Sequence, residues 1–149
     1  MIYELITIGI LLLSSVCDLG RKRIPNRVTY ICQGVGLVIH GLSGGPPGII
    51  FSLKGMAIMF ILLYPVYIVR GLGAGDVKLF MAVASFLGAC KSITILIISM
   101  PISVIFGLIK KLMIYKGRRG TVGEKTYIEY APIMLAAYLL MLGHTYLGP

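Results

Sequence analysis

The chain has 149 residues, of which 58% are hydrophobic and 13% are charged. Soluble domains carry about a quarter of charged residues, so this composition excludes an ordinary soluble domain and predicts a protein of the lipid bilayer. The formal net charge of +9 does not indicate a nucleic-acid partner, because most basic residues flank apolar runs, as they do in the loops of membrane proteins.

Six apolar segments follow one another along the chain. A membrane helix needs about 20 residues, so the segments predict an all-α, polytopic integral membrane protein with about six transmembrane helices, in a single domain over residues 1–149. The first segment carries Glu4 where a signal peptide would be basic, and we expect it to stay as a span. The segments are 2–19, 28–43, 48–69, 73–89, 92–115 and 127–147.

The loops between these segments alternate in charge. The loop RKRIPNR (21–27) holds four basic residues and the stretch 110–125 is also strongly basic, whereas GLSGGPPG (41–48) holds none. Basic loops of membrane proteins lie in the cytoplasm. The pattern therefore predicts a multi-pass protein of the cytoplasmic membrane with both termini outside, and contacts between its basic loops and anionic membrane lipids.

Asp18 and Asp76 belong to a set of only five acidic residues, and both fall in or beside apolar segments. An ionisable group inside a membrane costs roughly 2.5–3.5 kcal/mol, which marks it as a functional candidate. Asp18 ends the first segment and Asp76 begins the fourth, so the predicted topology brings both to the cytoplasmic end. Two adjacent carboxylates share a proton and so provide a general base and a general acid. Taken separately, each aspartate has a structural alternative, such as an ion pair of Asp18 with Arg21 or Lys22.

Glycines alternate before Asp76, in the stretch GLGAGDVKL (71–79). Each glycine costs a helix up to about 1 kcal/mol relative to alanine. One interpretation is therefore an extended stretch that binds a substrate strand through its backbone. The alternative is a helix-packing motif, because Gly71 and Gly75 also form GxxxG.

The run Gly73–Ala74–Gly75–Asp76 resembles the GxGD motif of membrane aspartic proteases, and its continuation through Lys78 resembles that of the type IV prepilin and preflagellin peptidases. In CDLGRKRIPNRVT (17–29), an aspartate is followed by Ile24, Pro25 and Asn26, which resembles the pattern around that family's first catalytic aspartate. The resemblance spans essentially the whole chain.

This resemblance implies a catalytic pair of Asp18 and Asp76, and substrate-binding or motif roles for Gly73, Gly75, Lys78, Ile24, Pro25 and Asn26. It implies cleavage of the basic leader from type IV pilin-like (Tad-type) prepilins at the cytoplasmic face. Larger relatives carry a CxxC-bearing region linked to N-methylation; this chain has no CxxC, so we expect peptidase activity alone. Asn26 is a candidate cap of the following helix.

A different class of function is a small transporter, or a non-catalytic assembly subunit, that uses Asp18 and Asp76 for proton coupling or packing. Transporters usually contain related halves, and we find no convincing repeat. No cofactor or metal is expected, since His40 and His144 fall near the outer ends and the three cysteines are scattered. Glu129 is expected to pair with a basic loop residue at the interface.

Overall fold

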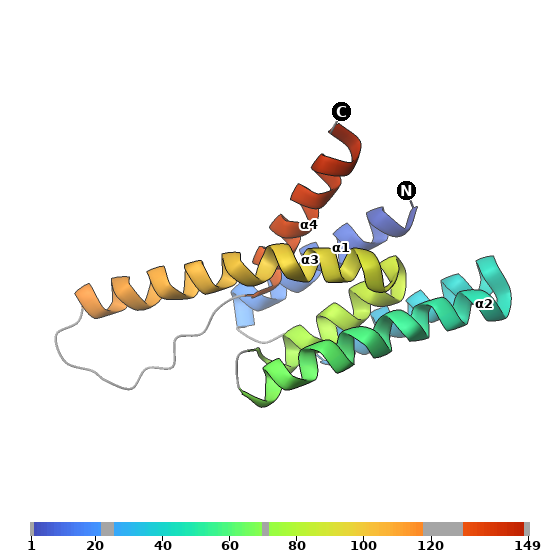
Figure 1. Cartoon of the computed structure of the whole chain (residues 1–149), viewed down its shortest axis with the longest axis horizontal. Helices are drawn as coiled ribbons and strands as arrows, with labels where there is room; N and C mark the ends of the chain where they lie inside the picture. Colours follow the sequence, from blue (N-terminus) through green and yellow to red (C-terminus); the bar gives the residue numbers. More distant parts are fainter. Residues whose placement is uncertain (1, 22–25, 70–71, 118–129, 148–149) are drawn as a thin grey trace.

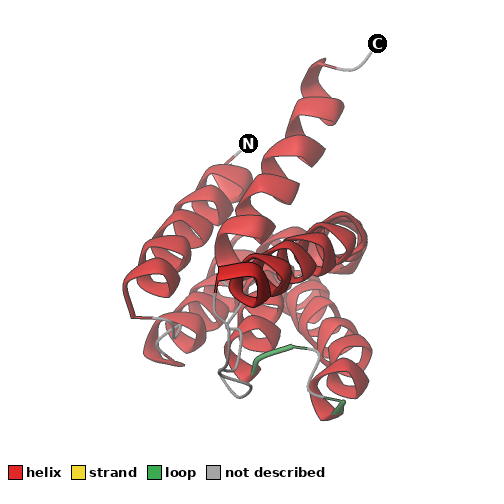
Figure 2. Cartoon of the chain, turned by 90° about the vertical axis from the view of Figure 1, so that its left-hand side faces the viewer, coloured by secondary structure: helices red, strands yellow, loops and turns green. Residues whose placement is uncertain are grey.

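The computed structural model of the chain describes residues 2–21, 26–69, 72–117 and 130–147. Over these residues the chain is helical, with short connecting loops (Figure 2). The all-α prediction is therefore confirmed. The helices are α1 (Ile2–Arg21), α2 (Asn26–Ile68), α3 (Ala74–Gly117) and α4 (Tyr130–Leu147).

Two of these helices are interrupted at a glycine. Gly45 in α2 has φ 60°, and Gly88 in α3 has φ 76°. Glycine adopts positive φ at little cost, so each of these residues can break the helical path. Figure 1 shows that α2 and α3 each run out and back as a hairpin. The described helices thus contain six helical segments, which match the six apolar segments of the sequence.

Two stretches of the described residues are candidate membrane spans by their length and apolar composition. Asn26–Ile68 and Ala74–Ile109 are long and apolar enough to cross a membrane. The predicted number of about six transmembrane helices is therefore met only in part. Large apolar side chains also lie exposed on every helix, as lipid contact would require. Examples are Val16, Ile61, Ile97 and Leu140.

Helix α3 lies at the centre of the packing and contacts α2, α4 and α1. Its fully buried side chains Leu79, Phe80 and Val83 form the core with Met134 and Tyr138 of α4. Leu79, Phe80 and Val83 lie within two turns after Asp76 in α3. Their packing against α4 therefore fixes the start of α3 relative to α4.

Small residues allow α2 and α3 to approach closely. A Cβ atom added at Gly36 would collide with the side chain of Ser85, and one added at Gly55 would lie 2.5 Å from the carbonyl oxygen of Ala84. The hydroxyl of Ser52 donates a 2.7 Å hydrogen bond to the carbonyl of Ser85. Glycine and serine at helix contacts are typical of helices that pack inside membranes.

The two ends of the chain meet at one end of the bundle. The hydroxyl of Tyr146 donates a 2.7 Å hydrogen bond to Glu4, and Lys91 forms a 2.9 Å salt bridge with the same carboxylate. Helices α1 and α4 are therefore antiparallel neighbours, and the end of α1 lies beside the start of α4.

Candidate active site

Asp18 lies near the end of α1 and is only 1% exposed. Its Oδ2 atom accepts a 3.3 Å hydrogen bond from the backbone N–H of Ala131, in the first turn of α4. The first N–H groups of a helix lack partners within the helix and carry a partial positive charge. The start of α4 therefore stabilises negative charge on the buried Asp18.

Asp76 lies in the first turn of α3 and is partly buried. Its Oδ2 atom accepts a 3.2 Å hydrogen bond from the N–H of Gly73, just before the helix. The carbonyl of Gly73 in turn accepts from the N–H groups of Asp76 and Val77, at 3.1 and 3.2 Å. The carboxylate reaching back to the N-cap N–H is one half of a capping box. A Cβ at Gly73 would lie 3.0 Å from the carboxylate oxygen, so glycine leaves room for this contact.

The two carboxylates belong to one site. Asp18 and Asp76 lie close enough for their carboxylates to interact electrostatically. The structure thus brings together two aspartates that are far apart in the sequence, one from the end of α1 and one from the start of α3. Such a pair can hold one proton between its members, which is the requirement for general acid–base chemistry.

Two residues at the start of α4, Tyr130 and Ala131, lie beside the aspartates and were missed by the sequence analysis. Tyr130 is buried, and its ring centroid lies 5.8 Å from that of Phe80, one turn after Asp76. The hydroxyls of Tyr130 and Ser99 share a 3.2 Å hydrogen bond. The N–H of Ala131 was missed because every residue except proline has one, so the sequence carries no signal for it.

The glycine stretch before Asp76 is partly helical, which differs from the interpretation of an extended, substrate-binding stretch. Helix α3 begins at Ala74, so Gly75 is helical, while Gly73 is exposed in the loop before it. An extended stretch across Gly73 and Gly75 is therefore wrong. The reason is the hydrogen bond from Gly73 to Asp76, which stabilises the first helical turn against the low helix propensity of glycine.

The segment that carries Asn26 contacts the segment that carries Asp76 and Lys78. Lys78 Nζ donates a 3.0 Å hydrogen bond to Oδ1 of Asn26 and lies 4.9 Å from the ring centroid of Tyr30. The side chain of Gln33 donates a 3.1 Å hydrogen bond to the carbonyl of Lys78. Helix α2 does begin at Asn26, but the side-chain oxygen of this residue bonds across to α3. Ile24 and Pro25 lie outside the described residues.

Other predicted contacts have mixed outcomes. Lys22, Glu129 and the side chain of Arg21 lie outside what the structure describes. The alternative ion pair of Asp18 with Arg21 or Lys22 therefore stays untested. The expected pairing of Glu129 with a basic loop residue also stays a prediction. His40 lies 3.0 Å from the carbonyl oxygen of Phe86 and stacks on Tyr3. Among the described residues, no group of three or more His, Cys, Asp or Glu side chains is placed to hold a metal ion.

Comparison with known proteins identifies a family for this chain. The profile of the type IV leader peptidase family matches residues 5–108, a stretch that includes both aspartates. The prepilin peptidase EppA of Methanothermobacter thermautotrophicus is 36% identical over 95 residues, covering 58% of this chain and 25% of the relative. The chain thus spans about a quarter of the length of that curated relative. No solved structure matches significantly.

The fold and the site define an all-helical protein with an apolar exterior and a pair of aspartates between its helices. The family match covers more than half of the chain. The chain belongs to the type IV leader peptidase family.

Proposed function

We propose that this chain is a membrane aspartic endopeptidase that removes the basic leader from pilin-like precursors, with Asp18 and Asp76 as the catalytic pair. The observation that carries the proposal is the electrostatic interaction between these two carboxylates, which come from separate helices. Asp18 is buried and Asp76 is partly buried. A packing role would require neither the pairing nor the burial, since an isolated carboxylate is more stable in water.

In the proposed mechanism, the two carboxylates share one proton. The ionised member takes a proton from a water molecule, which attacks the carbonyl carbon of the scissile peptide bond. The protonated member gives its proton to the leaving amide nitrogen as the carbon–nitrogen bond breaks. Each carboxylate is oriented by a backbone N–H, that of Ala131 for Asp18 and that of Gly73 for Asp76. These contacts limit rotation of the reacting groups.

The proposed substrate is a type IV pilin-like precursor of the Tad type, with a short basic leader followed by one apolar helix. Such a helix would enter from the bilayer and pack beside the exposed apolar side chains of the bundle. We place the aspartate pair near the cytoplasmic face, with about six membrane crossings in one domain and both termini outside. The support for this orientation is the alternation of basic and neutral loops.

Co-expression with a candidate precursor tests the proposal. Mass spectrometry of the precursor should reveal a new N-terminus directly after the basic leader, and only in cells that contain the peptidase. A matched precursor without its basic leader serves as the control and should remain uncut. The absence of cleavage for a panel of pilin-like precursors, with the peptidase present in the membrane, would contradict the proposed activity.

A further inference from the structure

A second candidate binding site lies between α2 and the first part of α3. It is a cavity of about 360 Å³ with largely aromatic walls. Phe60 and Tyr64 pack together with ring centroids 5.4 Å apart, which gives one wall a fixed shape. The cavity is lined by Tyr30, Gln33, Phe60, Tyr64, Tyr67, Ala74, Val77, Lys78 and Met81.

This cavity is separate from the aspartate pair. The lining residues Ala74, Lys78 and Met81 follow one another at spacings of four and three residues, so they share one face of α3. Asp76 lies two residues from both Ala74 and Lys78, a spacing that points it to a different face. A ligand in the cavity would therefore lie across α3 from the carboxylates.

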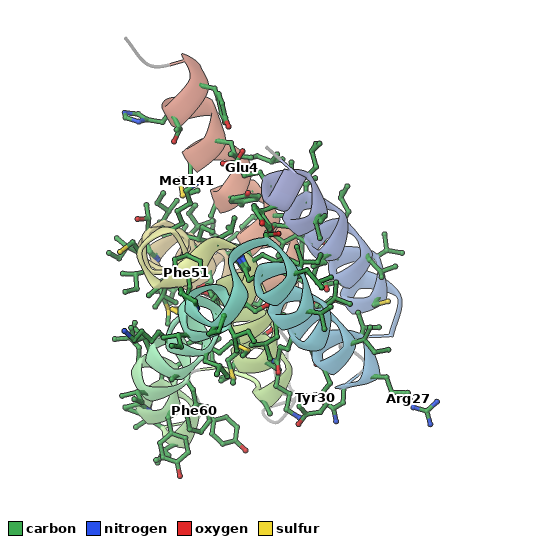
Figure 3. All side chains as sticks on the ribbon, turned by 90° about the vertical axis from the view of Figure 1, so that its right-hand side faces the viewer. Glu4, Arg27, Tyr30, Phe51, Phe60 and Met141 are labelled. Atoms are coloured by element: carbon green, nitrogen blue, oxygen red, sulfur yellow. The ribbon has the colours of Figure 1, made fainter. Side chains whose placement is uncertain are left out.

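Lys78 gives the cavity a positive charge at a fixed position. Its ammonium group has three N–H donors, and Asn26 accepts a hydrogen bond from it at 3.0 Å. The ring of Tyr30, 4.9 Å away, holds the same group from another side. The exposed Arg27 and the labelled Tyr30 and Phe60 lie along one side of the bundle in Figure 3. The cavity thus combines apolar walls with a positioned cation.

We propose that this cavity binds an anionic phospholipid, with its phosphate at Lys78 and its apolar part against Phe60, Tyr64 and Met81. A basic leader peptide does not suit the site because Lys78 would repel it. A free phosphate ion does not suit the walls, which are mostly aromatic and aliphatic. An amphipathic anion satisfies both the charge and the apolar surface.

Native mass spectrometry of the whole chain in detergent tests the proposal. We expect phosphatidylglycerol to be retained about fivefold more than phosphatidylcholine with the same acyl chains, since one lysine near an anionic surface contributes about that factor. Lys78→Gln should abolish this preference, and Lys78→Arg should keep it. The matched control is Lys54→Gln, which neutralises an exposed α2 lysine that does not line the cavity and should leave the preference unchanged.

A second variant tests the apolar part without changing the charge. Met81→Trp should fill the cavity and reduce phosphatidylglycerol retention while Lys78 remains in place. The proposal is overturned if the wild-type chain retains both lipids equally, or if Lys78→Gln and Met81→Trp retain phosphatidylglycerol as the wild type does. Displacement of the lipid by excess inorganic phosphate would also overturn it, because the site would then be a plain anion site.

Discussion

Lys78 donates a hydrogen bond of 3.0 Å to Asn26, which lies 52 residues earlier in the chain. Asn26 begins the helix that comes next in the chain after the helix of Asp18, and Lys78 lies two residues after Asp76. The contact therefore joins the two segments that carry the aspartates. Gln33, about two turns further along α2, strengthens this contact between helices by donating a hydrogen bond to the carbonyl of Lys78.

We expect Asn26→Ala and Lys78→Met each to slow leader cleavage, because each change frees the start of α2 from the start of α3. A displacement near 1 Å at the reacting groups can cost about a hundredfold in rate. The stability cost should be about 1 kcal/mol or less, since the contact is exposed. Cleavage rates of the single and double variants give the measurement, with Lys54→Met as the control. Effects on the rate that simply multiply in the double variant would show that the two residues act independently.

Close packing of α2 against α3 predicts opposite effects at two neighbouring glycines. Gly36→Ala should destabilise the protein by about 1–3 kcal/mol because the new methyl group collides with Ser85. Gly34→Ala is the matched control: a Cβ there meets nothing within 4 Å, and alanine favours the helix by up to about 1 kcal/mol. Thermal unfolding in detergent measures both. Equal stability of the two variants would argue against this helix contact.

The N–H of Ala131 should be required for full activity because it donates to Asp18. Ala131→Pro removes this donor at a position in the first turn of α4, where proline is tolerated. A hydrogen bond to a charged group is worth about 1.5–3 kcal/mol, so we expect cleavage to fall at least about tenfold. Ala131→Gly keeps the N–H and should retain most activity. Equal cleavage rates for Ala131→Pro and Ala131→Gly, at equal abundance, would show that this hydrogen bond does not support catalysis.

The orientation in the membrane is tested by single cysteines placed in the two basic loops. Cysteines introduced at positions within 20–27 and 110–125 should react only with reagents that reach the cytoplasm, because basic loops stay on that side. Cys17, Cys32 and Cys90 must first be replaced, since at least Cys90 is exposed. Labelling of both loops from the outside would contradict the placement of the aspartate pair.

Much of the helical arrangement was predictable from apolar runs and their breaks. The stretch GLSGGPPG predicted the reversal that the structure places at Gly45. The second reversal, at Gly88, lies just before the break at 90–91 between the fourth and fifth apolar segments, which contains the charged Lys91. The difference has a physical reason: a charged residue marks where an apolar run stops, whereas the turn needs a residue that tolerates positive φ.

The site was predictable only in part. Asp18 and Asp76 were singled out because charge is costly in apolar segments, and the structure brings them together. Their orienting partners are the backbone N–H groups of Ala131 and Gly73. Backbone N–H donors could not be predicted from residue types, because every residue except proline has one. Likewise, the bond between Lys78 and Asn26 depends on how α2 packs on α3, which no local pattern specifies.

The central claim is that Asp18 and Asp76 act as one catalytic unit, and the cleavage rate of their asparagine variants tests it most directly. Asparagine keeps the shape of the side chain but cannot exchange a proton with water or with the leaving amide. Asp18→Asn and Asp76→Asn should therefore each abolish leader cleavage at unchanged membrane abundance, and the double variant should be little worse than either. Asp18→Glu moves the carboxylate by about one methylene, so its rate of leader cleavage should fall about a hundredfold. Cleavage at the wild-type rate by either asparagine variant would contradict the account.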